Sequence, residues 1–460
     1  MYNPDIQYRC TIIRGKSILK MDNYLPIYSE ILNEICPIPA KSFAKTFDEK
    51  LSEYMKVDSN SKRIKNHRTE SVDKLLGLIF EKEGIIYLSD RSIKYLRDND
   101  QPALFKSICY KFQQPNGSQK ISTTIDKIQH NISFKPYHFV LSLLKLARQK
   151  SVLLTKKEIA YYVLNALQVL QGKVSVDEVL SVILYDREKG LKKEVDISKN
   201  YAWGYQHINE QFDYLKLANL IREDKEKVWL NTKEQIAIDY FIDNLNKPLA
   251  LDYSKYNLEE KKIGKKIESD WQIYFGSLDQ IEEDKFKTSI NSLDTGSLMV
   301  PERPADSQSS TELGNDGEIF VFNHEKNIVK SFNPRLVNKV KPFWKIKGLG
   351  YDIISIEASR NLKNPEFTRY IEVKTTKRVS KPNFTDTWDS INMTRNEWVA
   401  AEQHKDHFYI YRIYFTNDGT FVSIINDPVR KNNENILYAT PTTYRVEFSD
   451  QAVDEKLKLA

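Results

Sequence analysis

Cysteines and long apolar runs are both scarce in this sequence, and each shortage excludes a class of protein. The 460 residues contain three cysteines, Cys10, Cys36 and Cys109, which are widely spaced and form no C-x-x-C pair. Neither a disulfide framework nor a zinc finger is expected. No apolar run approaches the roughly 18 residues that a membrane-spanning helix needs, and the first ten residues do not look like a signal peptide. The sequence therefore predicts a soluble, cytoplasmic protein with no membrane partner.

Charged residues are plentiful and slightly more often basic than acidic. They make up 29% of the chain, and the formal net charge is +6 at pH 7. A mildly basic balance is compatible with a polyanionic partner. At roughly 100 to 200 residues per domain, the chain is long enough for two to four domains.

The first part of the chain predicts three helices followed by a β hairpin. Apolar residues recur at helical spacing in residues 22–35 and 40–55, residues 61–80 change from basic to apolar, and residues 81–90 predict a turn between two strands. This order is typical of a winged helix, whose third helix enters the DNA major groove by its N-terminal end. The side chains at that end are Lys65, Asn66, His67, Arg68, Thr69 and Glu70. They predict a base-reading surface; the alternative is a helical turn capped by Thr69 or Asn66, with solvated charges.

A second copy of this pattern follows at an offset of 142 residues. The matched pairs are Leu75 with Leu217, Leu78 with Leu220, Ile79 with Ile221, Ile86 with Val228, Tyr87 with Trp229, and Leu88 with Leu230. Internal duplication of a helix-and-wing unit is the economical explanation. The second reading helix is predicted over residues 198–221, with the candidate DNA-binding residues Asn200, Trp203, Gln206, His207 and Asn209. Tyr201 and Trp203 are alternatively core residues.

Basic side chains also mark the N-terminal arm. The first twenty residues contain one acid, Asp5, and four basic residues, Arg9, Arg14, Lys16 and Lys20. Such an arm can lie along phosphates, so Arg14 and Lys16 are candidate DNA contacts. A strand that ends in a surface turn is the alternative.

Near the C-terminus, two apolar-rich runs at residues 351–358 and 367–376 flank a polar connection, which predicts a strand, a loop and a strand. Asp352 opens the first strand, and Glu372 and Lys374 lie on one face of the second because they are two residues apart. If the strands pair, the three side chains meet at one end of a sheet. Two carboxylates that close repel each other unless something positive lies between them, and a divalent cation bound by oxygen ligands is the usual solution.

This arrangement suits phosphodiester hydrolysis. A metal held by Asp352 and Glu372 can polarise a phosphate and lower the pKa of a bound water, and the Lys374 ammonium can orient that water or offset developing charge. Glu318, near the start of a predicted helix, is a candidate further ligand or an acid that complements the helix dipole. The E-x-K spacing alone is common in this chain, so a solvated cross-strand charge pair is the alternative for Glu372 and Lys374. Glu397 forms a predicted capping box with Thr394 and is assigned a structural role.

The motif Glu318, Asp352, Glu372-Val373-Lys374 resembles the PD-(D/E)XK nuclease superfamily, including archaeal Holliday-junction resolvases, although Tyr351 stands where the motif has proline. The whole chain resembles the BpuJI family of type IIS restriction endonucleases, through segments such as YRCTIIRGKSILKMDNYLP, FKSICYKFQQPNG and EIAYYVLNALQVLQG. The resemblance implies an enzyme that reads a short asymmetric double-stranded DNA sequence and cuts nearby with a separate, Mg²⁺-dependent domain. It also implies a homodimer and a cognate DNA methyltransferase in the host.

The expected architecture is multidomain, with a mainly α N-terminal half and a C-terminal α/β nuclease domain. The expected divisions are 1–125 for the arm and first winged helix, 126–245 for the second, 246–287 for a helical spacer or dimerisation element, 288–313 for a flexible linker, and 314–460 for the nuclease. Two rival functions share parts of this pattern. One is a modification-dependent or structure-selective nuclease, and the other is a DNA-binding regulator with an inactive nuclease fold.

Overall fold

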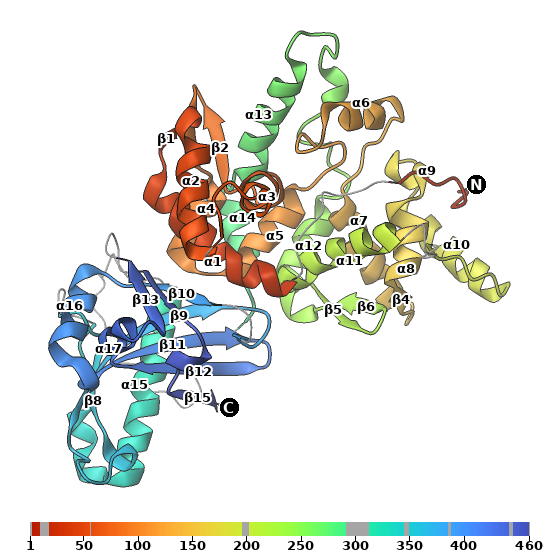
Figure 1. Cartoon of the computed structure of the whole chain (residues 1–460). Helices are drawn as coiled ribbons and strands as arrows, with labels where there is room; N and C mark the ends of the chain where they lie inside the picture. The colour runs from red at the N-terminus through yellow and green to blue at the C-terminus, as the bar shows by residue number, and fades with distance from the viewer. Residues whose placement is uncertain are drawn as a thin grey trace. The chain divides into compact units, whose positions relative to one another are not determined.

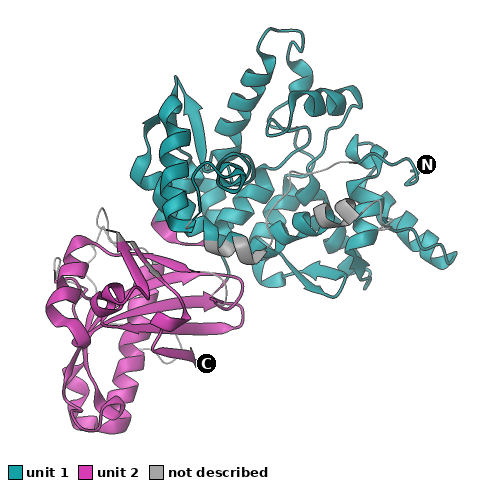
Figure 2. Cartoon of the chain, in the orientation of Figure 1, with its two compact units in different colours: residues 1–96, 101–289 teal, residues 97–100, 290–460 magenta. Residues whose placement is uncertain are grey.

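The computed structural model divides the chain into two compact units, residues 1–96 with 101–289 and residues 97–100 with 290–460 (Figure 2). It describes residues 2–9, 18–55, 57–195, 202–290, 312–344, 349–384, 388–440 and 445–459. Within this described part, no helix is long and apolar enough to cross a membrane. Most of the predicted linker, residues 291–311, lies outside the described residues.

The first unit begins with a group of helices that ends in a small sheet. In chain order these elements are α1 (Ile18–Ile35), β1 (Ile38–Pro39), α2 (Ala40–Met55), α3 (Lys62–Asn66), a π-helical segment (His67–Leu75), β2 (Ile79–Lys82) and β3 (Ile85–Leu88). The strands form an antiparallel sheet in the order β1-β3-β2 (Figure 1). Glu83 and Gly84 both have positive φ, which is the backbone conformation that a tight two-residue hairpin requires. The predicted turn between two strands is confirmed.

A similar group follows later in the same unit. Its elements are α7 (Pro136–Gln149), β4 (Leu154–Thr155), α8 (Lys156–Ile159), a π-helical segment (Ala160–Leu164), α9 (Leu167–Leu170), α10 (Val176–Glu188), α11 (Ala202–Leu217), β5 (Ile221–Asp224) and β6 (Lys227–Leu230). The strand order β4-β6-β5 repeats that of the first sheet. Helix α8 begins with the predicted capping box of Thr155 and Glu158.

The backbone repeats at the offset that the sequence predicts. Both strands of the second hairpin, β5 and β6, lie 142 residues after β2 and β3. Gly77 and Asn219, also 142 apart, both adopt left-handed φ, at 57° and 61°. Ser89 Oγ donates to the Gly77 carbonyl and Asn231 Nδ2 donates to the Asn219 carbonyl, each at 2.7 Å. The same helix-to-strand turn is therefore built twice, with glycine in one copy and asparagine in the other, the two residue types that tolerate this conformation best.

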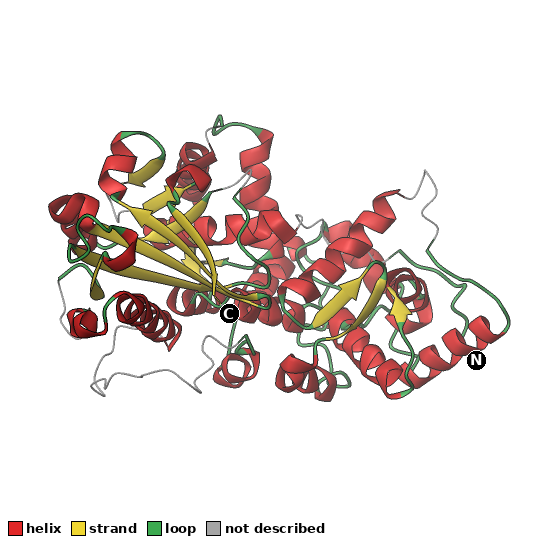
Figure 3. Ribbon diagram, turned by 90° about the horizontal axis from the view of Figure 1, so that it is seen from below, coloured by secondary structure: helices red, strands yellow, loops and turns green. Residues whose placement is uncertain are grey.

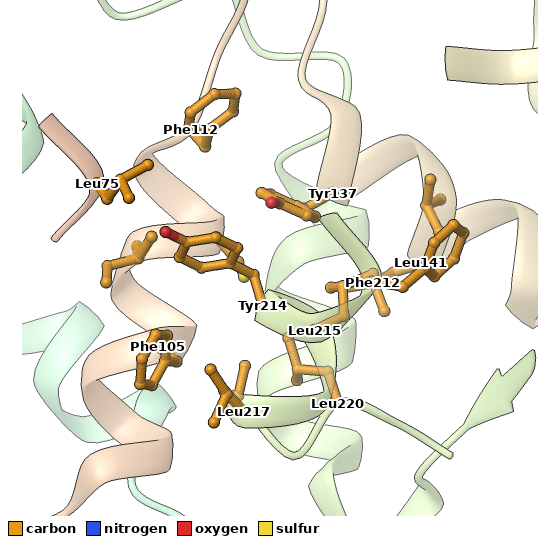
Figure 4. Packing of buried hydrophobic residues seen from close by; sticks show 14 of the residues in the cluster. Leu75, Phe105, Phe112, Tyr137, Leu141, Phe212, Tyr214, Leu215, Leu217 and Leu220 are labelled. Atoms are coloured by element: carbon orange, nitrogen blue, oxygen red, sulfur yellow. The ribbon is translucent and has the colours of Figure 1, made fainter. Parts of the chain in front are cut away.

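The remaining helices of this unit join both copies into one core. They are α4 (Asp90–Asp98), α5 (Gln101–Lys111), α6 (Ile121–Gln129), α12 (Gln235–Asp243), α13 (Ile263–Gly276) and α14 (Gln280–Phe286). Figure 4 shows Tyr214 of α11 facing α5, where its ring lies 5.8 Å from that of Phe105 in an edge-to-face contact. Trp271 and Phe275 of α13 belong to the same apolar cluster. Residues 246–287, predicted to be a helical spacer or a dimerisation element, belong to this unit and contribute buried residues to its core; their role in dimerisation stays a prediction.

The second unit is a mixed sheet with helices on both faces (Figure 3). Its elements are α15 (Glu312–Phe332), β7 (Lys341–Pro342), β8 (Ile353–Ile356), β9 (Thr368–Lys377), β10 (Asp389–Asn392), α16 (Arg395–His404), β11 (Phe408–Thr416), β12 (Gly419–Asn426), α17 (Pro428–Asn433), β13 (Leu437–Thr440), β14 (Arg445–Phe448) and β15 (Glu455–Leu459). Six strands lie in the order β15-β12-β11-β9-β8-β7, and β10-β14-β13 form a separate sheet. The β9 and β11 strands are parallel, and α16 lies in the connection between them.

Alternation along the central strands separates two apolar layers. Ile371 and Val373 of β9 share a cluster with Val321 and Phe322 of α15. On the other face, residues of β11 and α16 form a second cluster, which includes Ile410, Tyr414, Trp398 and Ala401. Glu372 and Lys374 alternate with Ile371 and Val373, so they lie on the α16 face.

A fully buried ion pair links distant segments of the N-terminal unit. Lys106 Nζ lies 2.6 Å from Glu234 Oε2, and the two side chains are 0% and 2% exposed. Asn219 Nδ2 and the Ser289 backbone N–H also donate to Glu234. Removing one member of such a pair leaves a buried charge without a counterion.

We predict that Glu234→Ala lowers the free energy of unfolding by about 3 to 5 kcal/mol, the typical cost of breaking a buried ion pair. The control is Asp239→Ala, which removes the exposed pair of Lys145 and Asp239 and costs no more than about 1 kcal/mol. Chemical denaturation followed by circular dichroism measures both. Equal midpoints for the two variants would contradict the prediction.

Candidate functional site

Pairing of β8 with β9 brings Asp352 beside Glu372. The two predicted strands do pair; they are antiparallel, and Ile353 lies opposite Ile371. Asp352 immediately precedes β8, and its backbone N–H donates to the Ile371 carbonyl at 2.9 Å. Its carboxylate Oδ2 accepts the Val373 backbone N–H at 2.8 Å. The Asp352 side chain is thus fixed against the segment of β9 that carries Glu372.

The ammonium of Lys374 completes a compact charged cluster. Lys374 Nζ lies 2.7 Å from Glu372 Oε1, and the Glu372 side chain is 5% exposed. Burial raises the pKa of Glu372 well above its usual value, and the charge of Asp352 raises it further. Burial likewise raises the pKa of Asp352 to about 6, opposed by Lys374. One ammonium therefore does not fully compensate the two adjacent carboxylates.

A third carboxylate, Glu397, reaches the same ammonium from α16. Glu397 Oε2 lies 2.8 Å from Lys374 Nζ. The predicted capping box is also present, because Glu397 Oε2 accepts the Thr394 backbone N–H at 2.9 Å and Thr394 Oγ1 accepts the Glu397 backbone N–H. Sequence reasoning assigned Glu397 to the cap alone and missed the contact with Lys374. The signal that could have found it is the parallel β9-α16-β11 crossover, which places α16 on the face of Lys374.

Glu318, the fourth candidate, lies on α15. Its neighbour Gly317 abuts β9 so closely that a Cβ atom there would lie 1.9 Å from Thr375 Oγ1. Thr375 alternates with Lys374 and faces the α15 layer. Helix α15 therefore approaches β9 from the opposite face, and a catalytic role for the buried Glu318 stays a prediction.

The donor set of Asp352 and Glu372 fits a hard divalent cation. Two adjacent carboxylates with raised pKa values are the electrostatic situation that a cation relieves. Mg²⁺ is usually held by one or two carboxylates, with substrate phosphates and water as the remaining ligands. Among the described residues, no group of three or more His, Cys, Asp or Glu side chains is placed to hold a metal by itself. The protein would therefore supply only part of the coordination shell.

The predicted reading surface of the first copy is only partly accessible. Lys65 and Asn66 are exposed at the end of α3. His67 is 3% exposed and hydrogen-bonds to the Tyr28 hydroxyl, so its assignment as a base-reading residue is corrected to a core residue. Arg68 donates two hydrogen bonds to Asp48 of α2, at 2.9 and 3.2 Å, and so its guanidinium is engaged within the protein.

The two remaining residues of that surface make local contacts. Thr69 Oγ1 donates to the Lys65 carbonyl at 2.9 Å, so it caps no helix start. Glu70 Oε1 lies 3.9 Å from Nζ of Lys74, one turn later in the helix. Two exposed cations that the prediction omitted, Lys62 and Arg63, precede Lys65 on α3. The accessible basic side chains thus include the predicted Lys65 and extend about one turn earlier, to Lys62 and Arg63.

Most candidates of the arm and of the second copy fall beyond what the structure describes. Arg14, Lys16 and Asn200 lie outside the described residues, as do the side chains of Trp203, Gln206 and His207, whose backbone belongs to α11. Asn209 is half-buried, and within the described part of the chain its buried Oδ1 has no hydrogen-bond partner. The roles of these residues in binding remain predictions.

Comparison with known proteins gives two family matches along the chain. Residues 2–272 match the family model described as restriction endonuclease BpuJI, N-terminal. Residues 317–425 match the model described as protein NO VEIN, C-terminal, which is a similarity of this part alone. No match is found among curated proteins.

One solved structure supports the first match. Its title is "Crystal structure of pyrene- and phenanthrene-modified DNA in complex with the BpuJ1 endonuclease binding domain". The similarity has 41% sequence identity and a TM-score of 0.58, and it covers 60% of this chain and all of that one. Because the matched model spans more than half of the sequence, the chain belongs to the family of the N-terminal part of restriction endonuclease BpuJI.

Proposed function

We propose that this protein is a type IIS restriction endonuclease. In this proposal the N-terminal unit recognises a short asymmetric sequence in double-stranded DNA, and the C-terminal unit hydrolyses phosphodiester bonds nearby as a PD-(D/E)XK nuclease. The observation that carries the cleavage step is the convergence of Asp352, Glu372 and Lys374 where β8 pairs with β9. The family match and the DNA complex of the related binding domain support the recognition step.

The chemistry assigned to the site follows from its charges. Asp352 and Glu372 would hold Mg²⁺, which supplies charge neutralisation at the scissile phosphate and lowers the pKa of water. Lys374 carries its ammonium within 3 Å of Glu372, on the same face of β9. From there it can orient the attacking water or donate to a non-bridging phosphate oxygen as negative charge develops. Val373 holds the Asp352 carboxylate in place through its backbone N–H.

We assign DNA recognition to two winged-helix units, the two copies described above. Each has the order helix, strand, helices and two-stranded wing, with its short first strand paired to the wing. Lys62, Arg63, Lys65 and Asn66 are exposed at the leading end of the third helix in the first copy. Cations at this position suit phosphates, and an asparagine suits adenine.

The division of labour between units motivates three further parts of the proposal. Because this proposal assigns recognition and cleavage to separate units, the enzyme can cut outside the sequence that it recognises. One site per chain hydrolyses one strand at a time, so we propose a homodimer for double-strand cleavage. Sedimentation of the protein with specific DNA tests this, and a monomer at every concentration would remove it. A cognate methyltransferase would protect host DNA.

The first prediction from this proposal concerns cleavage itself. Long unmethylated DNA of known sequence should give discrete fragments with Mg²⁺ and none with EDTA. Asp352→Ala and Lys374→Ala should abolish cleavage while retaining DNA binding, because the site lies in the other unit from the helices assigned to recognition. Gel analysis of the fragments and a binding assay measure both. Wild-type cleavage by Asp352→Ala would show that the site is assigned wrongly.

The same experiment separates the rival functions. Cleavage of methylated DNA alone would indicate a modification-dependent nuclease, and cleavage of a four-way junction alone would indicate a structure-selective one. Tight sequence-specific binding without cleavage of any of these substrates would favour a DNA-binding regulator.

The second prediction concerns stability. Because the folded-state pKa of Asp352 is raised to about 6, above its unfolded value near 4, the metal-free protein loses stability as pH rises from about 4 to about 6. Asp352→Asn keeps an oxygen that can accept the Val373 N–H but removes the charge. At pH 8 it should stabilise the metal-free protein by about 1 to 3 kcal/mol, and at pH 4 by much less. Thermal unfolding in EDTA measures this, and a stabilisation that does not depend on pH would refute it.

The third prediction concerns DNA affinity. The double variant Lys62→Ala, Lys65→Ala should weaken binding to all sequences and reduce the salt slope of log K by about 0.9 for each phosphate that is no longer neutralised. Asn66→Ala should instead weaken binding mainly to the recognised sequence. Lys458→Ala, an exposed lysine on β15 of the other unit, is the control. An unchanged salt slope in the double variant would indicate that these lysines of α3 do not contact phosphates.

A further inference from the structure

Helix α16 delivers a carboxylate to the ammonium of Lys374 from a direction independent of β9. Lys374 Nζ lies between Glu372 Oε1 at 2.7 Å and Glu397 Oε2 at 2.8 Å. The Lys374 and Glu397 side chains are 19% and 15% exposed, so the cluster reaches the protein surface. The ammonium therefore has two acidic partners, and only one of them lies on its own strand.

The position of the Glu397 oxygen is fixed by the helix start. Glu397 Oε2, the atom that contacts Lys374, also accepts the Thr394 backbone N–H at 2.9 Å. Thr394 Oγ1 in turn accepts the Glu397 backbone N–H at 3.3 Å. A carboxylate in the first turn of a helix is stabilised as an anion by the helix dipole. The capping box thus holds a charged oxygen at a defined point beside Lys374.

The charges of the cluster make the second partner necessary. The Glu372 carboxylate would interact more weakly with the Lys374 ammonium if it also bound a divalent cation shared with Asp352. If Glu372 turned to a cation, Glu397 would remain as the carboxylate in direct contact with the Lys374 ammonium. Without Glu397, Lys374 would compete with the cation for Glu372.

We propose that Glu397 is a positioning residue of the nuclease site, which holds the ammonium of Lys374 and so releases Glu372 to bind the divalent cation. This inference rests on the proposed function. It assigns Glu397 a role beyond the helix cap, in which it acts through Lys374 and Glu372 and touches neither DNA nor metal.

The capping geometry allows the two roles of Glu397 to be separated. Glutamine at the third helical position still supports a capping box, so Glu397→Gln keeps the cap and removes the charge. Thr394→Ala removes part of the cap and keeps the charge. Glu402→Gln removes a charge from the same helix, where the side chain accepts a hydrogen bond from Trp398 and makes no contact with Lys374 that the structure describes. Each variant therefore differs from the wild type in one property: the charge at Glu397, the cap at Thr394, or a charge elsewhere on the helix.

The decisive experiment measures Mn²⁺ affinity of the full-length variants by paramagnetic resonance, beside single-turnover cleavage of DNA. Glu397→Gln should weaken Mn²⁺ binding and slow cleavage at saturating Mg²⁺ by about 10- to 100-fold, the usual effect of losing a group that supports a metal ligand. DNA affinity, measured in Ca²⁺, should not change. Thr394→Ala should lower the melting temperature but keep Mn²⁺ affinity within about twofold, and Glu402→Gln should match the wild type.

Two results would overturn the inference. One is wild-type Mn²⁺ affinity and cleavage in Glu397→Gln, and the other is an equal loss in Thr394→Ala, which would reduce Glu397 to a cap. If the wild type binds Mn²⁺ but cuts no DNA, the proposed function fails, while the Mn²⁺ comparison still decides the role of Glu397. A wild type that binds no Mn²⁺ would overturn both.

Discussion

The pairing of β8 with β9 is the constraint on which the candidate site depends. Two backbone N–H groups hold one acid beside another in a largely buried place: that of Asp352 donates to the Ile371 carbonyl, and that of Val373 donates to the Asp352 carboxylate. Burial and mutual repulsion both disfavour the charged form of the two carboxylates, which would be more stable apart and in water. The two carboxylates are therefore held in an electrostatically unfavourable arrangement, which the surrounding sheet stabilises. Such local conflict is expected at functional sites, and it agrees with the cation site proposed above.

Buried ion networks on both faces of the sheet hold the strands that carry this site. On the α15 face, Glu325 accepts hydrogen bonds from Arg360 and from the Tyr411 hydroxyl, which also accepts from Arg369 of β9. Burial would raise the pKa of Glu325, but the two arginines lower it to about 2. The carboxylate thus stays charged in the core.

On the α16 face, Asp389 accepts from Arg378, Arg412 and the Tyr414 hydroxyl. Arg412 lies opposite Lys374 in the β9–β11 register. Networks of this kind have rigid geometry because each charge is satisfied only in one arrangement. The network joins Asp389 of β10 to β11, the strand that pairs with the Lys374 strand β9.

Local patterns predicted much of the fold, and the failures have a common cause. The duplicated hairpins, the β8–β9 pair and the caps at Thr155 and Thr394 all follow from residues close in sequence, and the structure contains them. The sequence also did not show that residues 246–287 pack into the N-terminal core, because a charged amphipathic helix gives no sign of which core receives its apolar side. His67 and Arg68 were assigned to a surface because their partners, Tyr28 and Asp48, lie 39 and 20 residues away. Glu397 was found by its local cap, and its contact with Lys374 was missed for the same reason.

The two copies in the N-terminal unit agree in their cores and differ on their outer faces. Leu78 and Ile79 match Leu220 and Ile221, and all four are buried. The outward pair across the hairpin has changed, from Phe80 stacked on Tyr87 in the first copy to Arg222 opposite Trp229 in the second.

Trp229 is 37% exposed, so the second hairpin presents an aromatic ring and a guanidinium where the first presents two rings packed on each other. Core positions are restrained by packing, whereas outward positions are free to diverge. Two equal surfaces would suit a repeated DNA sequence. Two different surfaces on one shared core suit an asymmetric DNA sequence, which is the kind of site that the proposed function requires.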